Sequence, residues 1–127
     1  MKEKTSEWLN KATEDLNGAR ILLEHEEAPT NIIGFLCQQC LEKSFKGFLD
    51  ENNVSFPRTH DLVYLVDLCS EIDPDFLEFK KEVNILLPFA VDARYPGFFL
   101  TGISKEKIQS LFQITERIFD FVYRRID

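Results

Sequence analysis

Two cysteines three residues apart, Cys37 and Cys40, are the first residues whose spacing suggests chemistry. A Cys-x-x-Cys pair serves redox chemistry when it lies at a helix N-terminus after a strand, where the helix dipole lowers a thiol pKa. A structural zinc site needs four ligands, and the other candidates, Cys69 and His60, form no second closely spaced pair. We therefore expect no metal and no cofactor, and we interpret the cysteines as packing residues. A thiol metal or redox protein is the alternative.

Polar side chains line the same segment. Gln38, Glu42 and Lys46 are four residues apart, Gln39 and Lys43 form a parallel row, and Glu42 precedes Lys46 in the favourable orientation for a helical ion pair. One interpretation is a solvated helix face. The other is a groove between helices or chains, because glutamine amides both donate and accept hydrogen bonds.

Two further clusters carry candidate functional groups. His60 and Asp61 follow a proline-containing loop, and we expect Asp61 to cap a short helix. Arg94 and Tyr95 precede a proline, and together they offer a guanidinium suited to phosphate or carboxylate and a ring on which a base can stack. The alternative for Arg94 is an ion pair with an acidic residue of the same chain.

The composition limits the class of protein. The chain has 127 residues, which predicts a single domain spanning residues 1–127, and its net charge of −7 argues against coating nucleic acid through bulk charge. The opening residues lack the apolar core of a signal peptide, and no apolar run approaches a membrane span of about 20 residues. We expect a cytoplasmic protein with reduced thiols and no membrane association.

The elements that must position these groups are helices. Apolar residues recur at helical spacing over nearly the whole chain, and no useful period-2 pattern occurs. The predicted helices cover about residues 6–25, 29–51, 61–70, 73–87 and 104–125. We therefore predict an all-α fold, an up-and-down bundle of about five helices, three or four of them long, with the second helix at its centre.

Helix boundaries have local signals. Thr5 or Ser6 is expected to cap the first helix, Asp73 the fourth and Ser104 the last. Pro88 is expected to kink or end the fourth helix, because it removes a backbone donor and crowds the preceding turn. A turn is predicted over residues 92–97.

The order of these motifs resembles that of the HEPN domain, a small helical module of prokaryotes. The matching motifs are Asp15-Leu16 with Ala19, then Phe35-x-x-Gln38-Gln39-x-x-Glu42-Lys43-x-x-Lys46, then His60-Asp61-Leu62, then Ala93-Arg94-Tyr95-Pro96. The resemblance implies a helical bundle that pairs as a homodimer and binds nucleotide. It also implies a minimal nucleotidyltransferase as partner, in a toxin–antitoxin type of system.

Many HEPN domains are metal-independent ribonucleases that use an arginine, four to six intervening residues and a histidine. With Arg94 as the arginine, the partner would fall at residues 99–101, which are Phe, Leu and Thr, and no histidine follows His60. Because general acid–base catalysis needs a group that titrates near neutrality, we predict a binding module rather than an enzyme. A ribonuclease toxin with an atypical site is the alternative, and its catalytic candidates are His60 and Arg94.

The residues predicted to form the nucleotide- or partner-binding surface share the motifs above. They are Gln38, Gln39, Glu42, Lys43, Lys46, His60, Asp61, Arg94 and Tyr95. Arg94 and the two lysines would contact phosphate, and Tyr95 would stack on a base.

Overall fold

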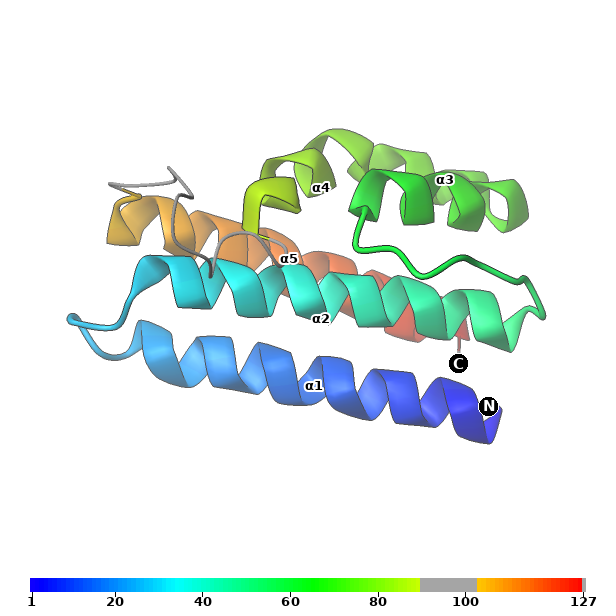
Figure 1. The fold of residues 1–127 in the computed structure, drawn as a ribbon, viewed down its shortest axis with the longest axis horizontal. Helices are drawn as coiled ribbons and strands as arrows, with labels where there is room; N and C mark the ends of the chain where they lie inside the picture. Colours follow the sequence, from blue (N-terminus) through cyan, green and yellow to red (C-terminus); the bar gives the residue numbers. More distant parts are fainter. Residues whose placement is uncertain (90–102, 127) are drawn as a thin grey trace.

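The computed structural model describes residues 1–89 and 103–126, and within these residues every regular element is a helix (Figure 1). The α-helices are α1 (Glu3–Leu23), α2 (Thr30–Glu51), α3 (Leu62–Ile72), α4 (Lys80–Leu86) and α5 (Lys105–Ile126). Two 3₁₀ helices, η1 (Pro74–Phe79) and η2 (Leu87–Phe89), flank α4. The all-α prediction is confirmed. None of the described helices is long and apolar enough to cross a membrane.

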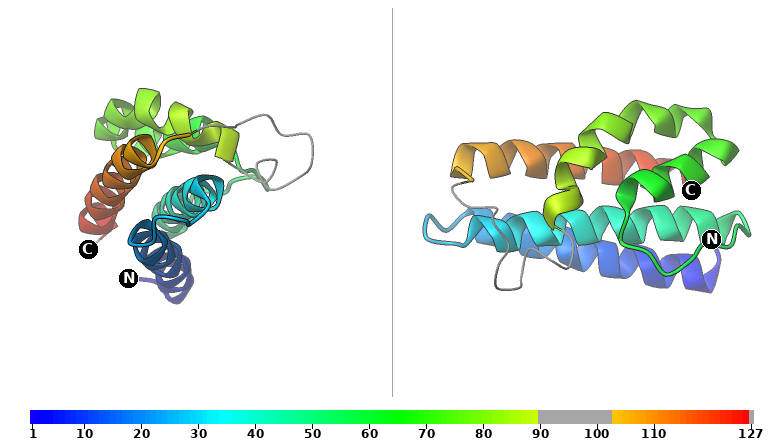
Figure 2. Two further views of the ribbon diagram at one scale, coloured as in Figure 1. Left: turned by 90° about the vertical axis from the view of Figure 1, so that its left-hand side faces the viewer. Right: turned by 45° about the horizontal axis from the view of Figure 1, so that its top comes forward.

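The three long helices lie side by side, and α3, η1 and α4 lie across one side of them (Figures 1 and 2). Helices α1 and α2 form an antiparallel hairpin, and α3 and α4 also run in opposite directions. The segment 52–61 differs from a short bundle loop because it runs back along α2, so that α3 points the same way as α2 (Figure 1). This return places residues 52–61 over one face of α2.

Helix α2 is the centre of the bundle, as predicted. It packs against α1, α3, α4, α5 and η2, and thirteen of its residues are buried. The apolar stripes predicted for α1 and α5 point inward. Aromatic rings join the layers, since Phe76 of η1 contacts Phe45 and Phe48 of α2 and Phe121 of α5.

Most of the predicted helix boundaries are confirmed. Asp61 accepts hydrogen bonds from the backbone N–H groups of residues 63 and 64, Asp73 caps η1, and Ser104 Oγ accepts from the N–H of residue 107. Helix α4 ends at residue 86, just before Pro88. The predicted turn over residues 92–97 lies outside the described residues.

The predicted cap of the first helix is wrong. Helix α1 begins at Glu3, two to three residues before the expected caps, and its N-cap is Lys2, whose side chain makes no capping hydrogen bond. Thr5 lies inside the helix, where its hydroxyl donates to Glu51 Oε1 at 2.9 Å. The Lys2 backbone N–H donates to the same oxygen at 2.9 Å. These contacts with the C-terminal end of α2 extend α1 toward the N-terminus, so a tertiary contact takes the place of a local side-chain cap.

Candidate functional site

The cysteines are core residues. Cys37 and Cys40 on α2 and Cys69 on α3 are free and fully buried. Burial raises the pKa of the Cys37 thiol to about 12 and also raises the pKa of Cys40 and Cys69. Such thiols are poor nucleophiles because the thiolate is the reactive form. Among residues 1–89 and 103–126, no group of three potential ligand residues is placed to hold a metal ion.

The polar row of α2 converges on the carboxylate of Glu42. Its Oε1 accepts hydrogen bonds from Gln38 Nε2 at 3.1 Å and Gln39 Nε2 at 3.4 Å, and it lies 2.8 Å from His60 Nδ1. Its Oε2 accepts from Lys46 Nζ at 2.9 Å, which confirms the predicted helical ion pair. We call these five residues the Glu42 network.

The interpretation of this row as a solvated face is wrong for its first three members. Gln38 has no exposed surface, and Glu42 and Lys46 expose only 4% and 7% of theirs. Burial alone would favour the neutral acid, but the hydrogen bonds from Lys46, His60 and Gln38 outweigh it and lower the pKa of Glu42. The network therefore contains a buried carboxylate that is ionised at neutral pH.

Two aromatic residues complete the surroundings of the Lys46 ammonium. Its Nζ lies 5.6 Å from the ring centroid of Trp8 on α1 and 5.9 Å from that of Phe56 in segment 52–61. Trp8 is itself held by a hydrogen bond of 2.6 Å from its Nε1 to Asp50 Oδ2. Neither residue has a sequence signal that places it here, because Trp8 is distant from α2 in sequence and Phe56 lies in a segment without a periodic pattern.

His60, the last residue but one of segment 52–61, covers one side of the network. The His60 carbonyl accepts from Gln38 Nε2 at 3.1 Å, while its ring contacts Glu42. The His60 side chain remains 54% exposed, unlike the rest of the carboxylate's surroundings. Asp61 does not face the network, because its carboxylate caps α3.

Gln39 and Lys43 lie half-buried at the edge of the network. Gln39 Nε2 donates to Gln38 Oε1 at 2.7 Å, and Lys43 Nζ donates to Asp15 Oδ2 of α1 at 2.7 Å. Burial raises the pKa of Asp15 although the bond with Lys43 opposes this shift. Five of the predicted residues thus meet at one carboxylate and Lys43 lies beside them, whereas Arg94 and Tyr95 lie outside the described residues.

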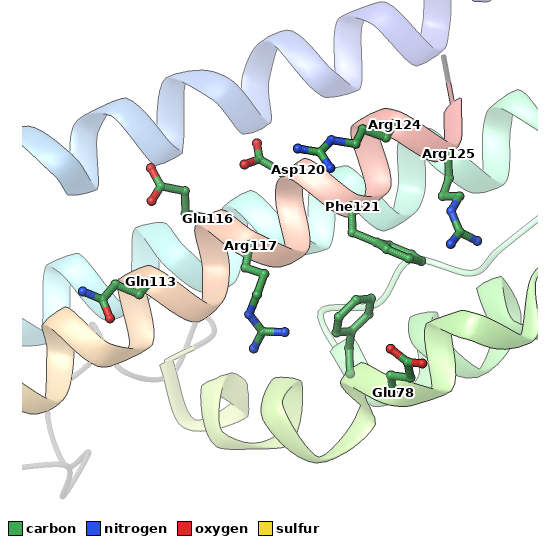
Figure 3. A pocket seen from close by; sticks show the side chains of 9 residues that line it. Glu78, Gln113, Glu116, Arg117, Asp120, Phe121, Arg124 and Arg125 are labelled. Atoms are coloured by element: carbon green, nitrogen blue, oxygen red, sulfur yellow. The ribbon is translucent and has the colours of Figure 1, made fainter.

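A concave feature away from the Glu42 network was not foreseen from the sequence. A groove of about 570 Å³ lies between η1 and α5 (Figure 3) and is lined by Glu78, Phe79, Gln113, Glu116, Arg117, Asp120, Phe121, Arg124 and Arg125. Arg117 pairs with Glu82 of α4, and Arg125 pairs with Asp73 and Asp75. These ion pairs join α5 to α4 and to the start of η1. The residues that line the groove include equal numbers of acidic and basic side chains, so their formal charges sum to zero.

The comparisons with known proteins agree with this arrangement. One solved structure, a crystal structure described as an archaeal HEPN homologue, is 23% identical in sequence, covers all of both chains and superposes with a TM-score of 0.76. At that identity it shows the shared fold. A search of curated proteins finds no match. The model of the HEPN domain matches residues 5–126, nearly the whole chain. The chain therefore belongs to the HEPN domain family.

Proposed function

We propose that this HEPN domain is a homodimeric binding module that acts with a minimal nucleotidyltransferase and binds nucleotide or RNA, in a toxin–antitoxin type of system. The absence of a histidine after His60 supports binding rather than cleavage, because the family's Arg-x4–6-His motif has no second member here. Membership of the family makes a helical interaction module the expected role.

The main support for the proposal is the Glu42 network, both its buried groups and the side chains at its surface. The network holds three polar groups inside the bundle, and burying an ion pair rarely stabilises a protein more than apolar packing would. At its surface, exposed His60 and half-buried Gln39 contact the same carboxylate oxygen, and half-buried Lys43 follows Gln39 by one turn of α2. A rigid set of different hydrogen-bonding groups and a cation suits recognition of a polar, anionic ligand such as a nucleotide.

Purification of the tagged chain from its native cells, followed by mass spectrometry, tests the partner. We expect a small nucleotidyltransferase in stoichiometric amount, and light scattering should show two copies of this chain. A chain that purifies alone as a monomer, and shows no heat of binding with ATP or RNA in calorimetry, would contradict the proposal.

A second candidate, an atypical ribonuclease, is favoured by the contact between His60 and Glu42. A carboxylate that holds Nδ1 of an imidazole orients the ring so that Nε2 can accept a proton, as a general base must. Expression of the chain alone should then arrest growth and cleave RNA. A harmless protein, or equal toxicity of the His60→Ala variant, would count against this function.

A further inference from the structure

A hollow of about 320 Å³ lies on α1 beside Trp8 and is lined by Lys4, Glu7, Trp8 and Lys11. We propose that this hollow binds planar aromatic anions, which stack on the Trp8 indole and pair with the ammonium groups of Lys4 and Lys11. The site is separate from the ligand surface proposed above, because none of its four lining residues belongs to the Glu42 network.

The indole of Trp8 is held in place before any ligand arrives. Its Nε1 donates to Asp50 Oδ2 at 2.6 Å, and its ring centroid lies 5.6 Å from Lys46 Nζ and 6.4 Å from the ring centroid of Phe56. These contacts come from α2 and segment 52–61, whereas the hollow is lined by α1. Trp8 is only half-buried, so part of it remains available to a ligand. A ring that is already fixed loses little conformational entropy when a ligand stacks on it.

The spacing of the lining residues shapes the hollow. Lys4 precedes Trp8 by four residues and Lys11 follows it by three, so the three side chains lie on one face of α1. The Cα atoms of the two lysines are about 10 Å apart along the helix axis. Lysine methylene groups cover apolar surface while the ammonium groups stay in water, so the walls beside the indole are apolar and the rim is charged. Ligand pockets measure about 300–1,000 Å³, and this hollow, at the lower end of that range, suits a ligand of one or two rings.

Both ammonium groups of the rim are weakly held by the protein itself. Lys4 Nζ lies 3.8 Å from Asp50 Oδ2 and Lys11 Nζ lies 3.6 Å from Glu14 Oε2, and the two lysine side chains are 70% and 65% exposed. Exposed ion pairs at such distances contribute little free energy, so either lysine can turn toward an anionic ligand at little cost. The one acidic side chain of the lining, Glu7, repels an anion and lowers its affinity.

These features together define the class of ligand. The indole face favours a flat aromatic ring, and stacking on an aromatic side chain raises affinity roughly tenfold. Two lysines against one glutamate favour a negative group over a neutral or positive one, and one exposed ion pair raises affinity about threefold. Aromatic carboxylates and nucleoside phosphates share this chemistry, so the experiment has to distinguish them.

The single tryptophan makes the site directly observable, because it gives one indole N–H resonance in a ¹H–¹⁵N NMR spectrum. The full chain is titrated with 1-naphthoate, with 1-naphthalenemethanol, which has the same ring without the charge, and with cyclohexanecarboxylate, which has the charge without the aromatic ring. Adenosine monophosphate tests whether a nucleotide is the ligand. Lys4→Gln, Lys11→Gln and Glu7→Gln change the rim, and Lys107→Gln, which removes an exposed lysine of α5, is the matched control. Circular dichroism checks that each variant is folded.

The anion 1-naphthoate should shift the Trp8 resonance saturably, and 1-naphthalenemethanol should bind about threefold and cyclohexanecarboxylate about tenfold more weakly. Lys4→Gln and Lys11→Gln should each weaken 1-naphthoate binding about threefold, Glu7→Gln should strengthen it, and Lys107→Gln should leave it unchanged. No saturable shift with either 1-naphthoate or adenosine monophosphate would overturn the assignment. Equal affinity for 1-naphthoate and 1-naphthalenemethanol, or equal losses in Lys11→Gln and Lys107→Gln, would also overturn it. If 1-naphthoate binds, a comparable shift with adenosine monophosphate assigns the site to nucleotides, and no shift assigns it to aromatic carboxylates.

Discussion

The negative charge of Glu42 is the part of the network whose removal has the best-defined cost. Glu42→Gln keeps the shape but leaves the Lys46 ammonium, only 7% exposed, without its counterion. Both carboxylate oxygens accept hydrogen bonds, Oε2 from Lys46 and Oε1 from Gln38 and His60. The glutamine amide replaces one of these oxygens with an NH₂ group, which would then face a donor instead of accepting from it. Removing one partner of a buried pair costs about 3–5 kcal/mol. Because glutamine keeps one acceptor, we expect a loss of about 3 kcal/mol.

Urea unfolding followed by circular dichroism and by the fluorescence of the single tryptophan measures this loss. Glu14→Gln is the control, because Glu14 pairs with Lys11 at 3.6 Å on the surface and should change the free energy of unfolding by less than about 0.5 kcal/mol. Lys46→Met introduced into Glu42→Gln should recover part of the loss, since it removes the unpaired charge. A loss below about 1 kcal/mol, or one equal to that of the control, would refute the assignment of Glu42 and Lys46 as a buried ion pair.

Three further predictions concern pH, packing and thiol reactivity. Because folding lowers the pKa of Glu42, its charge stabilises the folded protein fully above the unfolded pKa of about 4.5, and this stabilisation is lost as the pH falls through the folded pKa. In urea titrations between pH 7 and pH 3, the difference in unfolding free energy between the parent and Glu42→Gln should therefore shrink. In thermal melts, Gly34→Ala should lower the free energy of unfolding by about 1–3 kcal/mol, because the added Cβ would overlap the ring of Phe89. Gly18→Ala is the control: its Cβ would make only an ordinary contact at 3.4 Å, so it should raise the free energy of unfolding by up to about 1 kcal/mol. At pH 8 the Cys37 thiol, with its pKa near 12, should react with a disulfide reagent only as fast as the protein unfolds, and fast labelling under native conditions would contradict its burial.

Helical periodicity was sufficient to predict the fold because every long helix of this chain has an apolar stripe and a polar remainder. The inward stripe of α5, from Ile108 to Val122, follows directly from spacing, and the caps Asp61 and Ser104 follow from residue type. The prediction of the first helix cap is wrong because a tertiary contact sets where α1 begins. Glu51, at the far end of α2, contacts Lys2 and extends α1, and no local signal encodes a partner so distant in sequence.

The candidate site was predicted in part for the same reason. Spacing placed Gln38, Glu42 and Lys46 on one face of a helix, and it could not say what covers that face. The cover is segment 52–61, which has no periodic pattern that would predict its course, together with Trp8, whose contact depends on how α1 packs against α2. An amphipathic pattern distinguishes polar from apolar faces, but a polar face can be buried when other polar groups satisfy it.

The burial of the network changes which of its residues can contact a ligand. Gln38, Glu42 and Lys46 are hydrogen-bonded to one another and inaccessible, so they can act on a ligand only through the groups that they position. Glu42 positions the His60 ring, and Gln38 positions its backbone. A substitution of Glu42 should therefore lower both stability and ligand affinity, whereas a substitution of His60 that preserves the donor to Glu42 should lower affinity alone. A loss of ligand affinity without a loss of stability in the His60 variant would indicate a binding site, whereas a loss of stability alone in the Glu42 variant would indicate a purely structural network.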